Sequence, residues 1–498
     1  MRGRALVVGS GLLLSSQVTI ALVQFGYAAL VSRIIAPGGF GDYAVALAAV
    51  GLASIFTTAG IGAATARAPE LGERQQRGLV RTALVLGVVG TATTVVLAAP
   101  WARLWGQPTA VGTVQLAGLV LLLGPLAAVM LNIMRREGRY HAVAVVTLSA
   151  GVVALALGTA AAWWARSAES LLVPAIVIPA LQALGAIIAL GRLILPRRDR
   201  LSAGEEGRFA RRASGVDAVA YLVGNLPAWC ISLVFGAPSL GAFNRATVVS
   251  SVPLYMLQSS ALSTVYPELR EGAVRSDRAA RTRSDIVLLM AWVAMPVTVG
   301  IAVLGSLLIE TVLGPQWQES EWIVPFLAVS AGIYLPTMVL YSVVETHGRF
   351  RPLLVAQLIA LAATVVGAAL TFLRHSSVPV LLSMSVGALL IHAVQLRVAS
   401  RAGLVDGKVV QRGYAELVLP TALFLLFTLA VRWTVLTFID SPALRLLAAG
   451  LLLCVAAVLA LPWLRSATPL RLARQYGVGR GTATASLPVD VPPDLPAA

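Results

Sequence analysis

The residues best suited to chemistry in this sequence are two arginines and five amides that lie in or beside long apolar runs. They are Arg33, Arg245, Gln17, Gln24, Asn225, Asn244 and Gln258. Side chains of these types bind polar or charged solutes through hydrogen bonds and charge. No aspartate or glutamate lies near the centre of an apolar run, and the two cysteines, Cys230 and Cys454, support neither a metal cluster nor a disulfide framework. The pattern favours binding over catalysis, and it predicts no metal or cofactor.

These candidates must be held by membrane helices, because the composition is that of an integral membrane protein. Of the 498 residues, 58% are hydrophobic and only 12% are charged, and the mean hydropathy is +0.84. Soluble domains carry about 25% charged residues. The formal net charge of +16 comes from arginines in short loops between apolar runs, where it sets the orientation in the membrane. We therefore expect no nucleic-acid partner.

About fourteen apolar runs approach or exceed the roughly 20 residues that a membrane-spanning helix needs. The expected spans are 8–34, 42–66, 80–102, 112–134, 142–164, 170–194, 215–236, 243–265, 286–312, 322–344, 352–373, 378–397, 415–437 and 442–463. With a cytoplasmic N-terminus, all but seven of the 38 basic residues fall on the cytoplasmic side, as the positive-inside rule requires. We therefore predict that both termini are cytoplasmic.

Short motifs recur in the same order in the two halves of the chain. The pairs are APGGFGDY (36–43) with APSLGAF (237–243), APEL (68–71) with YPEL (266–269), LWGQP (104–108) with LGPQW (313–317), and EGRYHAV (137–143) with HGRFRPL (347–353). Each member of a pair follows the same helix of its half. We predict a duplicated six-helix unit, and the two copies have parallel topology because six is an even number.

The expected fold is an all-α polytopic membrane protein with two lobes around a central cavity. The predicted parts are an N-lobe at 1–200 with helices 1–6, a C-lobe at 201–412 with helices 7–12, two added helices at 413–464, and a basic, then disordered cytoplasmic tail at 465–498. Transporters built from such repeats hold their substrate between the halves and expose it to alternate sides. Polar side chains on the first two helices of each half should line the cavity, which selects the seven residues above.

The sequence resembles a known family. The elements that carry the resemblance are GDY (41–43), GAFNRA (241–246), YPEL (266–269) and GPQW (314–317). They are similar to motifs of the oligosaccharide flippases, the polysaccharide transporters of the multidrug/oligosaccharidyl-lipid/polysaccharide exporter superfamily. The resemblance covers about residues 1–465. It implies an alternating-access carrier that moves a polyprenyl-pyrophosphate-linked oligosaccharide from the inner to the outer leaflet of the bacterial cytoplasmic membrane.

The implied substrate gives the candidate residues roles. A pyrophosphate cannot cross hydrocarbon unpaired, and the planar donors of Arg245 and Arg33 would meet it, while the amides would meet the sugar. The alternative for both arginines is that they extend to the membrane surface, and for the amides that they bond across packed helices. We expect Asp42 to be a helix N-cap and Arg432 to find a partner within the bundle. The expected interface anchors are Trp101, Trp105, Trp317, Trp322 and Trp463.

Two related functions remain as alternatives. A peptidoglycan-precursor flippase would be expected to carry several arginines on its first helices, whereas this chain has Gln17 and Gln24 before Arg33. A multidrug exporter is the other alternative, and the missing central carboxylate disfavours it. A membrane glycosyltransferase or polymerase would need a large outer loop, and every predicted outer loop is short. The expected partners are the lipid-linked oligosaccharide, membrane lipids, a polysaccharide polymerase and glycosyltransferases, and we expect a monomer.

Overall fold

The structure, a computed structural model, describes residues 23–67, 72–192, 194–195, 205–251, 253–254 and 277–464. Within these residues all regular structure is helical, and eleven helices are long and apolar enough to cross a membrane. The chain divides into two compact units, 1–449 and 450–498. The fold and the site described below belong to the first unit, and the second contributes the end of the last helix.

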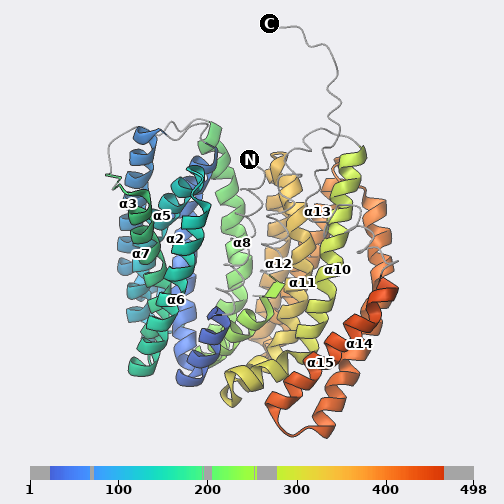
Figure 1. The fold of residues 1–498 in the computed structure, drawn as a ribbon. Coiled ribbons are helices and arrows are strands. Elements are labelled where there is room, and N and C mark those ends of the chain that lie inside the picture. The colour runs from blue at the N-terminus through green and yellow to red at the C-terminus, as the bar shows by residue number, and fades with distance from the viewer. Residues whose placement is uncertain are drawn as a thin grey trace, which may run out of the picture. The chain divides into compact units, whose positions relative to one another are not determined.

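Among the described residues, six labelled α-helices lie in the first half of the chain (Figure 1). They are α2 (Pro37–Arg67), α3 (Glu73–Val96), α4 (Ala98–Leu104), α5 (Val111–Arg136), α6 (Tyr140–Ala165) and α7 (Val173–Leu190). The second half contains α8 (Glu205–Phe235), α10 (Asp277–Leu308), α11 (Gln318–Thr346), α12 (Phe350–Arg374), α13 (Val378–Arg401), α14 (Gly407–Phe438) and α15 (Pro442–Leu464). Further helical residues at 23–34 and 237–251 precede α2 and follow α8.

Short irregular turns separate several of these helices. They are the 3₁₀ turns Pro108–Ala110, Ala168–Leu172 and Pro315–Trp317, and the π-helical turn Ile309–Leu313. The expected spans 8–34 and 243–265 lie partly outside the described residues, and α15 adds an apolar stretch at Pro442–Ala456. The total of fourteen spans therefore stays a prediction. The tail 465–498 lies outside the described residues.

Three helices extend beyond the apolar spans that hydropathy predicts. The described part of α8 includes residues from Glu205, that of α10 residues from Asp277, and α14 begins at Gly407, whereas the predicted spans begin at 215, 286 and 415. These added turns carry charged residues that favour helix but are excluded from hydrocarbon. Hydropathy identifies only the apolar part of a helix, and in α8 this part runs from Gly215 to Phe235, close to the predicted span 215–236.

Asp42 is another correction. Because Pro37 occupies the first position of α2, where proline is well tolerated, Asp42 lies inside the helix and is not its N-cap. Its carboxylate instead accepts a hydrogen bond from the Thr109 hydroxyl at 3.0 Å.

The two halves use their helices in similar ways. In the first half α5 packs against α3 and α7, and in the second half α11 packs against α10 and α13. The neighbouring pairs α6 with α7 and α12 with α13 also correspond in chain order. In both halves the fourth predicted helix therefore contacts the third and the sixth.

The halves meet where α2 and the helix 237–251 begin. A side chain added at Gly41 would overlap the carbonyl group of Ala237, and one added at Gly241 would overlap the carbonyl group of Pro37. The absence of a Cβ at both positions lets the two backbones touch. The two glycines open the matching motifs GDY and GAF, so the contact is reciprocal.

A methyl group placed at this crossing should loosen it. Gly41→Ala and Gly241→Ala each push a Cβ into the backbone of the opposite half, and overpacking of this kind costs about 1–3 kcal/mol. We expect each variant to lower the apparent melting temperature of the purified protein in detergent. Gly38→Ala is the matched control, because a Cβ there meets no atom within 4 Å. Unchanged melting in both crossing variants would contradict the close approach.

Candidate functional site

Around the glycine crossing, segments far apart in the chain exchange polar contacts. We call this region the seam and define it as residues 32–43, 104–108, 229–245 and 309–317. According to the predicted topology it lies toward the outer face of the membrane. It brings Arg33 and Arg245, the two predicted phosphate-binding residues, into the same contact region between the halves.

Two matching loops bond across the seam. In the LWGQP loop, the Gln107 amide donates to the hydroxyl oxygen of Ser232 at 3.2 Å. In the LGPQW loop, Gln316 donates to the carbonyl of Ser32, and the indole N–H of Trp317 donates to the same carbonyl at 2.9 Å. Each loop thus bonds to the last turn of a helix that belongs to the opposite half. Like the glycine contacts, these hydrogen bonds occur twice, once from each half to the other.

The prediction that Trp105 and Trp317 anchor the protein at the membrane interface was wrong. Both side chains are buried in the seam, with relative exposures of 3% and 0%. Trp322, by contrast, is exposed. A tryptophan near the end of an apolar run therefore does not distinguish a lipid contact from a contact between halves.

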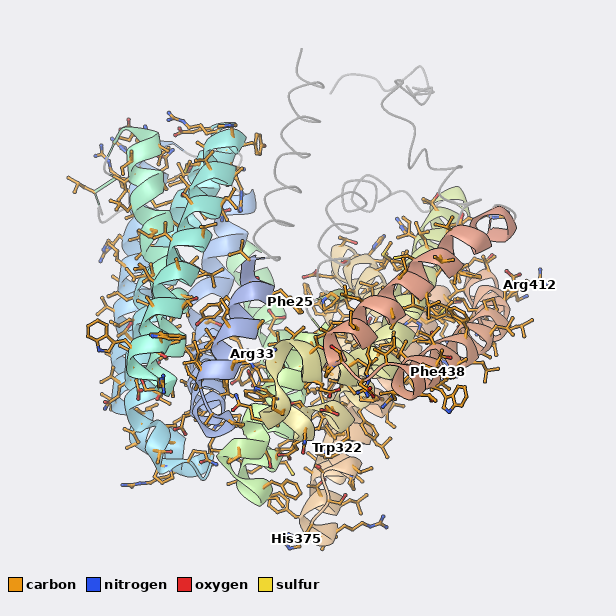
Figure 2. All side chains as sticks on the ribbon, turned by 60° about the horizontal axis from the view of Figure 1, so that its bottom comes forward. Phe25, Arg33, Trp322, His375, Arg412 and Phe438 are labelled. Atoms are coloured by element: carbon orange, nitrogen blue, oxygen red, sulfur yellow. The ribbon has the colours of Figure 1, made fainter. Side chains whose placement is uncertain are left out.

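Arg33, which is labelled in Figure 2, donates hydrogen bonds to the end of a helix in the opposite half. Its guanidinium donates to the carbonyls of Thr311 at 2.5 Å and Val312 at 3.2 Å, both in the π-helical turn that follows α10. Carbonyl groups at a helix end lack partners within their own helix, so a cation satisfies them well. The side chain is exposed, and its described hydrogen bonds go to the backbone.

Arg245 has different surroundings. Its side chain is buried, with 7% exposure, and no ion pair within the described part of the chain includes it. One Nη donates to the side-chain oxygen of Asn244 at 2.8 Å, while Nε has no hydrogen-bond partner among the described residues. The neutral phenol groups of Tyr27 and Tyr43 lie in its neighbourhood. A buried guanidinium is therefore held among neutral groups with donor capacity to spare.

The ring of Phe40 completes the surroundings of this cation. The guanidinium carbon of Arg245 lies 4.2 Å from the ring centroid of Phe40, in a cation–π contact. The same ring packs against Trp317 in a T-shaped pair with centroids 5.1 Å apart. Phe40 comes from α2 in the first half, and both of its partners come from the second half. Sequence reasoning missed Phe40, because an aromatic residue in an apolar run carries no signal of its own.

The remaining predicted site residues are not gathered at the seam. Asn225 donates to the carbonyl of Tyr221, one turn earlier in α8, at 3.0 Å. Gln24 is exposed on the first helix. Gln17 and Gln258 lie outside the described residues. The structure thus brings together Arg245 and Asn244, with Arg33 nearby in the seam.

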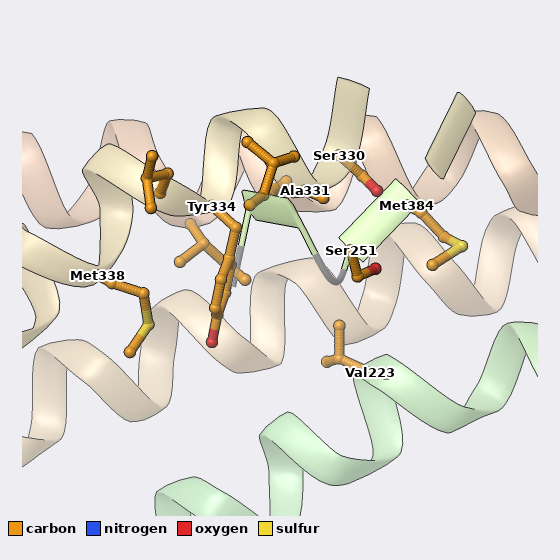
Figure 3. A pocket seen from close by; sticks show the side chains of 12 residues that line it. Val223, Ser251, Ser330, Ala331, Tyr334, Met338 and Met384 are labelled. Atoms are coloured by element: carbon orange, nitrogen blue, oxygen red, sulfur yellow. The ribbon is translucent and has the colours of Figure 1, made fainter. Parts of the chain in front are cut away.

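A cavity of about 490 Å³ lies within the second half, between α8, the helix 237–251 together with Leu254, α11 and α13. Its lining is mostly apolar and includes the hydroxyl-bearing residues Ser251, Ser330 and Tyr334. Figure 3 shows Tyr334 and Met338 at one end of the cavity and Ser251 and Met384 at the other. Serine and methionine in apolar helices are too common to predict such a cavity from sequence.

The cavity and Arg245 share a helix. Ser251 follows Arg245 by six residues, which is about 9 Å along the axis at 1.5 Å per residue. Asn225 in α8 directly follows Gly224, which lines the same cavity. A solute that reached Arg245 with one charged group could therefore extend a neighbouring group toward these hydroxyls.

Arg432 bears out the expectation of a partner within the bundle. Its guanidinium donates to the carbonyl of Val303, in α10, at 3.1 Å. This contact attaches α14 to α10. The residue is thus accounted for without a ligand.

Sequence comparison identifies relatives in polysaccharide transport. Residues 30–321 match the family described as "Polysaccharide biosynthesis protein". The chain is 24% identical over 327 residues to the succinoglycan biosynthesis transport protein ExoT of Rhizobium meliloti (strain 1021). That match covers 63% of this chain and 64% of the relative, so it spans a little less than two thirds of the relative's length.

Solved structures share the fold at low identity. The lipid II flippase MurJ in an inward closed conformation matches with a TM-score of 0.66 and 12% identity, over 91% of this chain and all of that one. An inward-facing multidrug resistance MATE family transporter of the MOP superfamily matches with a TM-score of 0.54 and 14% identity, over 80% and 95% of the two chains. The eukaryotic MATE transporter AtDTX14 gives 0.53 and 15%, over 82% and 100%. These likenesses concern the fold alone.

Removal of an exchanged amide should weaken the seam. Gln107→Leu keeps the approximate size of the side chain but removes a buried donor to Ser232, at a cost of about 1–3 kcal/mol. Gln316→Leu removes an exposed donor from the Ser32 carbonyl, to which Trp317 still donates, so its cost should be smaller. We expect each variant to melt at a lower temperature in detergent. Gln318→Leu, at an exposed position at the start of α11, should have little effect. If the two seam variants melted like the control, the exchanged bonds would contribute nothing to stability.

Proposed function

Because the chain belongs to the polysaccharide biosynthesis protein family, we propose that it moves a polyprenyl-diphosphate-linked oligosaccharide from the inner to the outer leaflet of the bacterial cytoplasmic membrane. It is a multi-pass membrane protein of the polysaccharide-flippase type, and its relatives are transporters and flippases, not enzymes. The lipid-linked oligosaccharide as substrate is the proposal.

The observation that supports this proposal most directly is the burial of Arg245 among neutral groups. Burying a charge in the membrane is costly unless another group compensates it, and the described surroundings of Arg245 supply only neutral groups. A diphosphate offers several acceptor oxygens and the missing negative charge. Guanidinium groups bind such oxygens with short, charge-assisted hydrogen bonds. An Nε without a partner among the described residues, in neutral surroundings, is what an anion site requires.

The proposed architecture is fourteen spans, with two parallel six-helix repeats at 1–200 and 201–412 followed by two helices at 413–464. Reciprocal contacts support the repeat: Gly41 with Gly241, and the loop of Gln107 with that of Gln316. Gly138 and Gly348, in the matching motifs EGR and HGR, also share a left-handed backbone, with φ of +76° and +68°. Such repeats allow one half to rock against the other around a fixed site.

The closed seam supports a proposed transport cycle. With the halves bonded at the predicted outer end, the diphosphate enters from the cytoplasmic side and meets Arg245 at the seam. The saccharide extends toward the hydroxyls of Ser251, Ser330 and Tyr334, while Asn225 and Asn244 supply further hydrogen bonds. Separation of the seam then opens the site to the outer leaflet. In this cycle Arg33, Gln24, Gln17 and Gln258 complete the polar path of the headgroup.

The proposed cellular setting completes the description. Both termini face the cytoplasm, and the chain acts as a monomer, because one polypeptide supplies both halves of the site. A glycosyltransferase must complete the lipid-linked oligosaccharide on the inner side, and a polymerase uses it on the outer side. These enzymes are the proposed functional partners.

Translocation should depend on the charge of Arg245. In proteoliposomes with a fluorescent polyprenyl-diphosphate oligosaccharide, we expect wild type to expose the lipid in the opposite leaflet. Arg245→Ala should be slower by about tenfold or more, because a charge-assisted hydrogen bond is worth about 1.5–3 kcal/mol. Arg103→Ala, which removes an exposed arginine near the seam, is the matched control.

Two results would contradict the proposal in different ways. Wild-type movement of lipid II or of cationic drugs, but not of the oligosaccharide lipid, would favour the peptidoglycan-precursor flippase or the multidrug exporter. Oligosaccharide transport that Arg245→Ala leaves unchanged would keep the function and remove Arg245 from the substrate path.

A further inference from the structure

Phe40 ties the buried cation to the bonds that close the seam. Its ring contacts the guanidinium of Arg245 on one side and the indole of Trp317 on the other. The indole N–H of Trp317 in turn donates to the carbonyl of Ser32. A short chain of contacts therefore runs from the proposed substrate site to a hydrogen bond that holds the two halves together.

We propose that the positive charge of Arg245 holds Phe40 in place while the site is empty, and that a bound diphosphate weakens this hold and so loosens the seam. The inference rests on the proposed function, since it makes the diphosphate the group that neutralises Arg245. It assigns Phe40 as a positioning residue that couples occupancy of the site to separation of the halves.

The physical basis is the sign of the charge that the ring faces. The face of an aromatic ring is its negative side, so it attracts a guanidinium that carries a net positive charge. When a diphosphate binds the in-plane donors of Arg245, the combined group is no longer positive. The attraction to the ring then falls without any need for the ring and the phosphate to occupy the same space.

The surroundings make Arg245 sensitive to such a change. Its described neighbours are neutral, so no carboxylate among them sets its net charge in advance. Burial also keeps the local dielectric low, which strengthens both the cation–π contact and its loss. Arg33 lacks this sensitivity, because carbonyl groups of the opposite half occupy its guanidinium.

The contact also breaks the symmetry between the two halves. When Gly41 is aligned with Gly241, Phe40 corresponds to Leu240, and Arg245 corresponds to Val45. Leu240 and Val45 are both fully buried apolar residues. The glycine crossing and the exchanged amides occur in both halves, whereas the cation–π pair is described at only one of the two related positions. A contact that only holds the halves together would be expected at both related positions. The cation–π pair is described at one of them, so we assign it to function.

The coupling must be reciprocal: if diphosphate binding weakens the contact of Arg245 with Phe40, then weakening that contact must tighten diphosphate binding. The test uses the full chain in detergent with fluorinated phenylalanines at position 40, which reduce the negative charge of the ring face with little change of shape. The probe is farnesyl diphosphate, and calorimetry measures its dissociation constant. We expect the constant to fall stepwise with fluorination, by about 2- to 30-fold in total, the range that a cation–π contact allows.

Two controls isolate the effect. Fluorination of Phe350, a buried ring in α12 outside the seam, should leave binding unchanged. In Arg245→Met, which removes the cation, farnesyl diphosphate should bind at least about tenfold more weakly, and fluorination of Phe40 should have no further effect. This interaction between the two changes is the signature that simple packing would not produce.

The outcomes that overturn the inference are distinct from those that overturn the proposed function. If wild type binds farnesyl diphosphate and Arg245→Met does not, but the constant is flat or rises across the fluorinated series, the coupling through Phe40 is wrong and the proposed site remains. If wild type fails to bind the diphosphate, or Arg245→Met binds it equally well, both the inference and the role of Arg245 fall.

Discussion

The backbone contact at Gly41 and Gly241 is the constraint on which the rest of the site depends. Two helix starts from opposite halves can approach this closely only where neither carries a Cβ. Phe40 directly precedes the first glycine, and Arg245 follows the second by about one helical turn. Their cation–π contact is therefore a consequence of the crossing. The same crossing brings the two glutamine loops within reach of the opposite helices.

A buried cation needs compensation, and the described structure of the seam provides it only in part. One amide oxygen and one ring face contact the guanidinium of Arg245, while its Nε has no partner among the described residues. A site of this kind has two arrangements, because a bound anion changes the electrostatic interactions of the guanidinium with its neighbours. In our account that change links the presence of the substrate to the opening of the path across the membrane.

The sequence predicted the membrane helices that the structure describes, and it singled out Arg245, whose role in binding stays a prediction, for physical reasons that are local. Apolar length identifies a membrane helix, and an arginine beside an apolar run is costly enough to single out Arg245. The helical turns that precede the apolar spans of α8, α10 and α14 were not predicted, because their charged residues leave no hydropathy signal. The role of Trp317 was missed because its acceptor, the carbonyl of Ser32, comes 285 positions earlier in the chain. Phe40 was missed for the same reason, since its partners belong to the opposite half.

The central claim is that occupancy of the buried cation site loosens the seam, and a distance measurement across the seam tests it most directly. Spin labels would be placed at Arg103→Cys and Gln318→Cys, two exposed positions in opposite halves, with Cys230 and Cys454 replaced by alanine. Double electron–electron resonance would then record the distance distribution with and without farnesyl diphosphate. The account predicts a shift to longer distances when the ligand binds. A distribution that stays unchanged at saturating ligand would contradict it.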